Sequence, residues 1–160
     1  VVVIDGGIHM LGIGDTAPDF TLPDQTGTER TLSALLADGP VVLFFYPKAM
    51  TAGCTKESCH FRDLAGEFAA VGAQRVGISA DKVDKQAAFD QQHSLGYPLL
   101  SDSTKAVAAQ FGVKRSLVPM SKRATFVIDT DRRILAVISS ELNFDVHADE
   151  ALDVLRARTS

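Results

Sequence analysis

The chain has 160 residues, of which 46% are hydrophobic, and this is enough for one compact domain with its own core. Its formal net charge of -4 is scattered along the sequence, which disfavours nucleic acid or an anionic membrane as the main partner. The apolar runs are too short to cross a bilayer, and the N-terminus lacks the basic region of a secretory signal, so we expect a cytoplasmic protein.

Residues 1–10 differ in character from the remainder of the chain. Ile8-His9-Met10 is consistent with a vector-derived junction before a native start at Met10, or with a disordered N-terminal segment. We therefore expect no functional role for these residues and a single domain over residues 11–160.

Helix and strand patterns alternate along that domain. Asp19 to Thr31 alternates loosely around an Asp-Gln-Thr-Gly turn, which predicts a short N-terminal hairpin. Residues 41–46 are continuously apolar between two prolines, a pattern typical of a central strand that is covered on both faces. The patterns further along predict strands over 75–79, 97–100, 124–128 and 134–138, and helices over 51–71, 82–92, 103–111 and 148–156. Together they predict an α/β fold, with a central mixed β-sheet flanked by helices.

Cys54 and Cys59 are the only two cysteines. Cys54 lies just after Thr51, a suitable N-cap, so its thiol is expected on the first turn of a helix at the carboxyl end of a strand. A helix start favours negative charge and the thiolate is the reactive form of cysteine, so Cys54 is a candidate nucleophile. Either cysteine taken alone could be a small buried hydrophobe. A zinc site with His60 is disfavoured, because a structural site needs four suitably spaced ligands.

The sequence around the two cysteines, Tyr-Pro-Lys-Ala-Met-Thr-Ala-Gly-Cys-Thr-Lys-Glu-Ser-Cys, resembles the active-site motif of the peroxiredoxins. It is most similar to the bacterioferritin-comigratory, or PrxQ, subfamily. Four further segments resemble that subfamily in the same order: Ala-Pro-Asp-Phe at 17–20, Phe-Arg-Asp at 61–63, Tyr-Pro-Leu-Leu-Ser-Asp at 97–102 and Arg-Ala-Thr-Phe-Val-Ile-Asp at 123–129. The resemblance implies a thioredoxin-like fold and a cofactor-free thiol peroxidase that reduces hydrogen peroxide and organic hydroperoxides.

The resemblance also implies roles for six residues. They are the peroxidatic cysteine Cys54, its active-site companions Pro47, Thr51 and Arg123, the resolving cysteine Cys59, and the carboxylate Glu57 that orients the arginine. A thioredoxin or similar dithiol is the implied reductant, and a monomer or weak homodimer is the implied assembly. Two features depart from the subfamily: Ala52 replaces a usual proline, and the loop 113–122 is short and lacks a glycine-lysine pair.

The expected chemistry follows from these residue types. Arg123 and the helix start both favour a thiolate at Cys54, and a second thiol can condense with the sulfenic acid that forms when the thiolate attacks a peroxide. The Thr51 hydroxyl can both donate and accept, and Pro47, which has no N–H, can exclude water. Gly53 carries no Cβ, so we expect it to leave room for the peroxide beside the thiol.

The spacing of the two cysteines predicts a conformational change. In an ideal helix, residues five apart have Cα atoms roughly 8–9 Å apart, whereas a disulfide needs roughly 4.4–6.8 Å. We therefore expect residues 51–60 to unwind when Cys54 and Cys59 form a disulfide.

Two other functions remain open from the residues alone. A thioredoxin-like disulfide reductase is disfavoured, because that class has its cysteines in Cys-x-x-Cys spacing. A non-enzymatic redox sensor could use the same local switch, and only catalytic turnover distinguishes it from a peroxidase. His9, His60, His93 and His147 share no spacing and are interpreted as surface residues.

Overall fold

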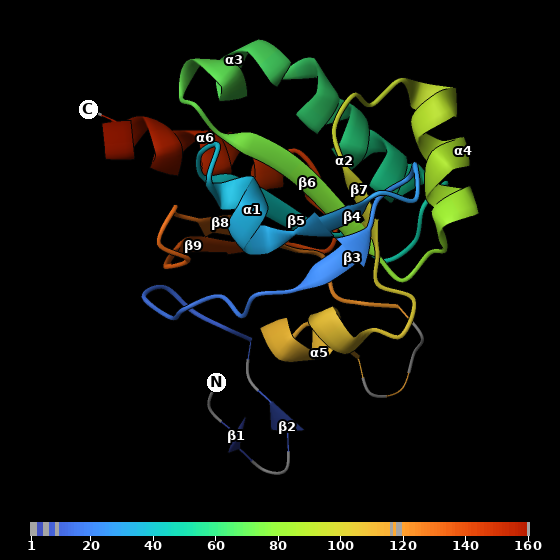
Figure 1. Ribbon diagram of the computed structural model, residues 1–160, viewed down its shortest axis with the longest axis horizontal. Coiled ribbons are helices and arrows are strands. Elements are labelled where there is room, and N and C mark those ends of the chain that lie inside the picture. Colours follow the sequence, from blue (N-terminus) through green and yellow to red (C-terminus); the bar gives the residue numbers. More distant parts are fainter. Residues whose placement is uncertain (1–2, 5–6, 9, 116, 118–119, 160) are drawn as a thin grey trace.

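A five-stranded mixed sheet forms the centre of the fold (Figure 1). The structure is a computed structural model that describes residues 3–4, 7–8, 10–115, 117 and 120–159. The sheet has the strand order β7-β6-β5-β8-β9, with bounds Val41–Phe45 (β5), Gln74–Ser79 (β6), Leu99–Ser101 (β7), Ala124–Ile128 (β8) and Ile134–Ser139 (β9). β5, β6 and β7 run parallel, and β8 pairs antiparallel with both β5 and β9. The predicted mixed sheet is therefore confirmed.

Helices cover both faces of this sheet. Their bounds are Leu32–Leu36 (α1), Ala52–Asp63 (α2), Ala65–Ala70 (α3), Val83–His93 (α4), Ala106–Phe111 (α5) and Val146–Thr159 (α6). Side chains of α2, α3, α4 and α6 form one apolar cluster with the sheet, and side chains of α1 and α5 form another. Figure 1 shows α2 and α3 on the side of the sheet opposite to α5. Within the part of the chain that the structure describes, no helix is long and apolar enough to cross a membrane.

β5 is buried along its whole length, as its apolar run predicts. Successive side chains of a strand point to opposite faces, so Val42 and Phe44 belong to the cluster beneath α2, and Leu43 and Phe45 to the cluster beneath α5. The Phe44 ring stacks on Phe61 of α2, with centroids 4.1 Å apart and an interplanar angle of 7°. This packing holds α2 against the central strand, so that its first turn lies beyond the carboxyl end of β5.

The helices differ from the prediction in two places. The single helix predicted over 51–71 is two segments, α2 and α3, because Leu64 has a non-helical backbone conformation (φ -94°, ψ 19°). The apolar pattern continues across this break, since Phe61 and Phe68 are both buried, and it therefore hides the change. Helix α1 was not predicted; its five residues are too few to show a helical period.

The predicted N-terminal hairpin is confirmed as β3 (Thr21–Pro23) paired antiparallel with β4 (Glu29–Thr31). In the chain before it, β1 (Val3–Ile4) pairs antiparallel with β2 (Gly7–Ile8) in a sheet of their own. Figure 1 shows β1 and β2 below the remainder of the molecule, away from α2.

Candidate active site

Cys54 is the third residue of α2 and is fully buried. Thr51 occupies the N-cap position with an extended backbone, and its carbonyl accepts a hydrogen bond from the Thr55 N–H at 2.9 Å. Cys54 therefore lies within the first turn, where backbone N–H groups lack helical partners and the helix dipole is positive. This environment favours a sulfur that carries negative charge.

Arg123 joins the thiol of Cys54 to a buried carboxyl group. Its Nη2 lies 3.4 Å from Cys54 Sγ, and its Nη1 donates to Glu57 Oε1 at 2.6 Å. The side chain of Arg123 is only 6% exposed and that of Glu57 is 0% exposed, so solvent screens neither contact effectively. Burial lowers the pKa of Arg123, but Glu57 and Cys54 outweigh burial and leave that pKa raised. The guanidinium is therefore a fixed positive charge beside the sulfur.

Glu57 lies one helical turn after Cys54 and faces a buried histidine. Burial raises the pKa of Glu57 from 4.5 to about 8, and Arg123 only partly opposes this shift. Its second oxygen, Oε2, has no hydrogen-bond partner and lies 3.7 Å from His147 Nδ1. Burial lowers the pKa of His147. The ring contacts the Thr125 hydroxyl through Nδ1 and the Ser140 carbonyl through Nε2, both at 2.8 Å.

The loop between β9 and α6 covers the other side of Arg123. Glu141 accepts the Arg123 backbone N–H at 2.8 Å through Oε2, and accepts Arg115 Nη2 at 2.6 Å through Oε1. The ring of Phe144 lies over the guanidinium, with 4.7 Å between Arg123 Cζ and the ring centroid. The arginine is thus held by a carboxyl group at each end and by an aromatic ring on one face.

The segment between β5 and α2 carries Pro47 and Thr51. Pro47 is half-buried and follows directly after Tyr46 at the end of the strand. The Thr51 hydroxyl donates to the Lys48 carbonyl at 2.8 Å and makes no capping bond to the helix, so Thr51 caps α2 by position only. Asp81 accepts the Ala49 N–H at 2.7 Å and so ties this segment to the end of β6.

Cys59 is half-buried on the same helix, and both cysteines are free thiols. The carbonyl of the preceding residue, Ser58, accepts a hydrogen bond from the buried Tyr97 hydroxyl at 2.7 Å. Three residues further, the Phe61 carbonyl accepts a hydrogen bond from Arg75 Nη1 at 3.0 Å. The helix is therefore anchored to its surroundings from Ser58 onward.

Two expectations from the sequence are wrong in this region. His147 is 0% exposed and is not a surface residue. Its position four residues before Ala151, on the apolar stripe of α6, is a signal that could have placed it inside. The space beside Gly53 is not open, because a Cβ there would lie 2.7 Å from Phe144 Cζ. Phe144 and Glu141 lie in a loop, where no periodic pattern indicates which side chains turn inward.

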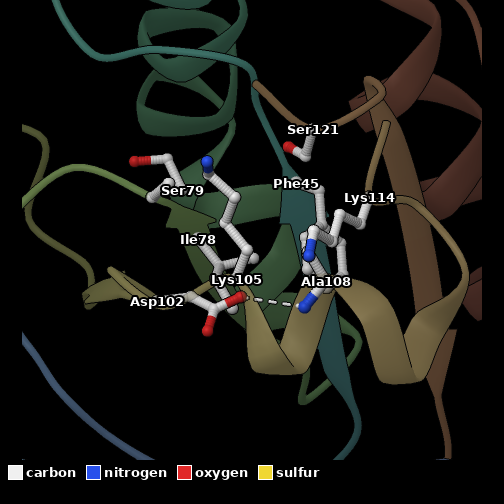
Figure 2. A pocket seen from close by; sticks show the side chains of 9 residues that line it. Phe45, Ile78, Ser79, Asp102, Lys105, Ala108, Lys114 and Ser121 are labelled. Carbon is white, nitrogen blue, oxygen red and sulfur yellow. Dashed lines mark hydrogen bonds between the residues drawn. The ribbon is translucent and has the colours of Figure 1, made fainter. Parts of the chain in front are cut away.

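A separate hollow lies on the other face of the sheet (Figure 2). Its volume is about 10 Å³, room for about one water molecule. Phe45 and Ala108 line it together with Lys105 and Lys114, and it contains neither cysteine. The carboxyl group of Asp102, at its edge, already accepts the Ala108 N–H at 2.8 Å. The site around Cys54 is therefore the better candidate for chemistry.

Comparisons with known proteins show the family to which the chain is similar. Residues 13–137 match the AhpC/TSA family. The crystal structure of peroxidoxin BcpB from Mycobacterium tuberculosis is 66% identical, with a TM-score of 0.90 over 95% of this chain and 100% of that one. The chloroplastic peroxiredoxin Q of Sedum lineare is 38% identical over 90% of this chain and 77% of its own length.

A third relative carries a functional description in its name. It is the bacterioferritin comigratory protein of Xanthomonas campestris, a structure presented for its alkyl peroxide reduction activity. It is 29% identical, with a TM-score of 0.80 over 88% of this chain and 92% of that one. These structural neighbours confirm the predicted thioredoxin-like fold.

Proposed function

Since the chain belongs to the AhpC/TSA family, and within it to the peroxiredoxin Q subfamily of thiol-dependent peroxidases, we propose that Cys54 is the peroxidatic cysteine and Cys59 the resolving one. The observation that carries this proposal is the 3.4 Å contact between Arg123 Nη2 and Cys54 Sγ at a helix start. Hydrogen peroxide and organic hydroperoxides are the substrates, in keeping with the alkyl peroxide reduction named for the Xanthomonas campestris relative.

In the first step, the Cys54 thiolate attacks the distal oxygen of the hydroperoxide. The S–O bond forms as the O–O bond breaks, and the leaving oxygen takes up a proton and departs as water or an alcohol. Cys54 is oxidised to sulfenic acid and the peroxide is reduced. Arg123 supports this step in two ways, because its fixed charge stabilises the thiolate and then the negative charge that moves onto the leaving oxygen.

Thr51 and Pro47 hold the peroxide in this scheme. The Thr51 hydroxyl uses its proton on the Lys48 carbonyl, which leaves its oxygen lone pairs to accept the peroxide O–H. Pro47 adds an apolar wall without an N–H group. Glu57 orients Arg123 through the 2.6 Å contact between Nη1 and Oε1.

In the second step, the Cys59 thiolate attacks the sulfur of the sulfenic acid. The S–S bond forms as the S–O bond breaks, and the leaving hydroxide takes up a proton and departs as water. The first turn of α2 must unwind for this bond to form, because of the Cα separation in an intact helix. A thioredoxin or similar dithiol then reduces the disulfide by exchange. This cycle requires a reducing compartment, so we place the enzyme in the cytoplasm. The assembly that we propose is a monomer or weak homodimer.

A coupled assay with thioredoxin, its reductase and NADPH tests this proposal. The unchanged chain should consume hydroperoxide over many turnovers. Cys54→Ser should abolish consumption, whereas Cys59→Ser should still consume one equivalent and then stop as sulfenic acid accumulates. Consumption of only one equivalent by the unchanged chain would indicate a redox sensor instead. Normal recycling of Cys59→Ser with thioredoxin would refute the resolving role.

A further inference from the structure

The thiol of Cys54 has no open path to solvent in the structure. Cys54 is 0% exposed, and the side chain of its partner Arg123 is only 6% exposed. A hydroperoxide must nevertheless bring an oxygen atom into contact with the sulfur. Some side chain must therefore move before the substrate can react, and the residues over Cys54 and Arg123 decide how large that substrate can be.

Phe144 lies where it can both move and limit the size of the substrate. Its ring lies over the Arg123 guanidinium at 4.7 Å and also fills the space next to Gly53, the residue before Cys54. Two ring atoms, Cζ and Cε1, would lie 2.7 and 2.8 Å from a Cβ at position 53. The ring thus covers both the cation and the backbone that carries the thiol.

Phe144 is held less firmly than the residues it covers. It is partly exposed, and among the described residues it belongs to neither of the two apolar clusters of the core. The loop that carries it is fixed beside Arg123 by Glu141, and its end is ordered by a bond from the Val146 N–H to Asn143 Oδ1. A rotation of the Phe144 side chain would uncover the guanidinium without moving these backbone anchors.

We infer that Phe144 is a movable cover over the Cys54–Arg123 pair, and that it determines specificity by admitting small hydroperoxides more readily than bulky ones. This inference rests on the proposed function of Cys54. A small peroxide needs only a small displacement of the ring, whereas an aryl or branched alkyl group needs the space that the ring occupies. The closed ring also excludes water, which strengthens the contact between the guanidinium and the thiolate.

The rate constants of Cys54 oxidation by hydrogen peroxide and by cumene hydroperoxide test this inference. Phe144→Ala opens the space, so the ratio of the cumene hydroperoxide rate to the hydrogen peroxide rate should rise about tenfold, within the range that pocket size controls. Phe144→Leu keeps most of the bulk and should leave the ratio near that of the unchanged chain. Phe144→Trp enlarges the cover and should lower the ratio.

A ratio is used because it cancels any general effect of losing the ring from Arg123, which slows both substrates alike. Leu142→Ala is the matched control: it lies two residues earlier in the same loop, is 86% exposed, and should not change the ratio. An unchanged or lower ratio in Phe144→Ala would overturn the inference. If that variant fails to fold, an unchanged or higher ratio in Phe144→Trp would overturn it instead. Cys54-dependent reduction of hydrogen peroxide in the same assay shows separately whether the proposed function holds.

Discussion

Arg123 contacts two acidic groups at once, and the strength of each contact depends on how deeply the groups are buried. Its Nη2 contacts Cys54 Sγ and its Nη1 contacts Glu57, with both partners fully buried. Hydrogen bonds to charged groups contribute about 1.5–3 kcal/mol, so Arg123→Met should slow oxidation of Cys54 by hydrogen peroxide roughly 10- to 100-fold. Stopped-flow measurement of Cys54 oxidation gives this rate constant.

Arg133→Met is a suitable control for that experiment. It removes the same charge from an exposed position in the turn between β8 and β9, outside the site. Its rate constant should equal that of the unchanged chain. An Arg123→Met variant with the same rate as the control would remove the guanidinium from the mechanism.

Glu57 links the site to the stability of the protein. Burial raises the pKa of this carboxyl from 4.5 to about 8, so between these values the folded chain holds a proton that the unfolded chain releases. The contribution of Glu57 to stability is therefore fully present below about pH 4.5 and is lost as the pH rises toward 8. Urea unfolding gives the free energy of unfolding of the unchanged chain and of Glu57→Gln. As the pH rises from 5 to 8, the value for the unchanged chain should fall relative to that of the variant.

Glu67→Gln provides the comparison, because Glu67 is exposed on α3. Urea unfolding of this variant over the same range gives the effect of removing a carboxyl group that is not buried. A flat difference for Glu57→Gln would contradict the raised pKa of the buried carboxyl.

The two halves of helix α2 are held by different contacts. The half that begins with Cys54 is tied to the remainder of the protein by Arg123, whereas the carbonyls of Ser58 and Phe61 are bonded to Tyr97 and Arg75. Oxidation of Cys54 changes the sulfur that Arg123 contacts, which weakens the hold on the first half, whereas the contacts of Ser58 and Phe61 do not involve Cys54. The unwinding should therefore be concentrated before Ser58.

Amide hydrogen exchange of the reduced and the peroxide-treated chain checks this expectation. Residues 52–57 should lose protection in the oxidised form, because their helical hydrogen bonds open when the disulfide forms. Helix α6, which packs against α2 but contains no cysteine, should keep its protection in both forms. Equal protection of residues 52–57 in the two forms would contradict the unwinding.

The parts of the molecule that the sequence predicts are those whose signal lies within a short stretch of the chain. The apolar run of β5 and the turn into α2 are contiguous in sequence, and their arrangement around Cys54 agrees with the prediction. Arg123 lies 69 residues away from Cys54, and no periodicity joins the two. Only the resemblance of residues 123–129 to a known family identifies it as a site residue from the sequence.

The remaining parts depend on packing between distant segments. His147 becomes buried because α6 packs on the sheet beside α2, and Phe144 and Glu141 face Arg123 because the loop before α6 folds over it. Phe144 and Glu141 have no spacing or composition that distinguishes them from other loop residues, and for His147 the only signal is its place on the apolar stripe of α6. The break at Leu64 was hidden for the opposite reason, since the buried stripe through Phe61 and Phe68 continues across it.

Mass analysis of Cys54 and Cys59 after titration with hydrogen peroxide tests the roles proposed for the two cysteines. One equivalent should convert the unchanged chain to a form that lacks two hydrogens, with both cysteines joined in a single disulfide-linked peptide. The same equivalent should add one oxygen to Cys54 in the Cys59→Ser variant. A chain in which Cys54 stays reduced while peroxide disappears, or in which the first oxygen appears on Cys59, would contradict the mechanism.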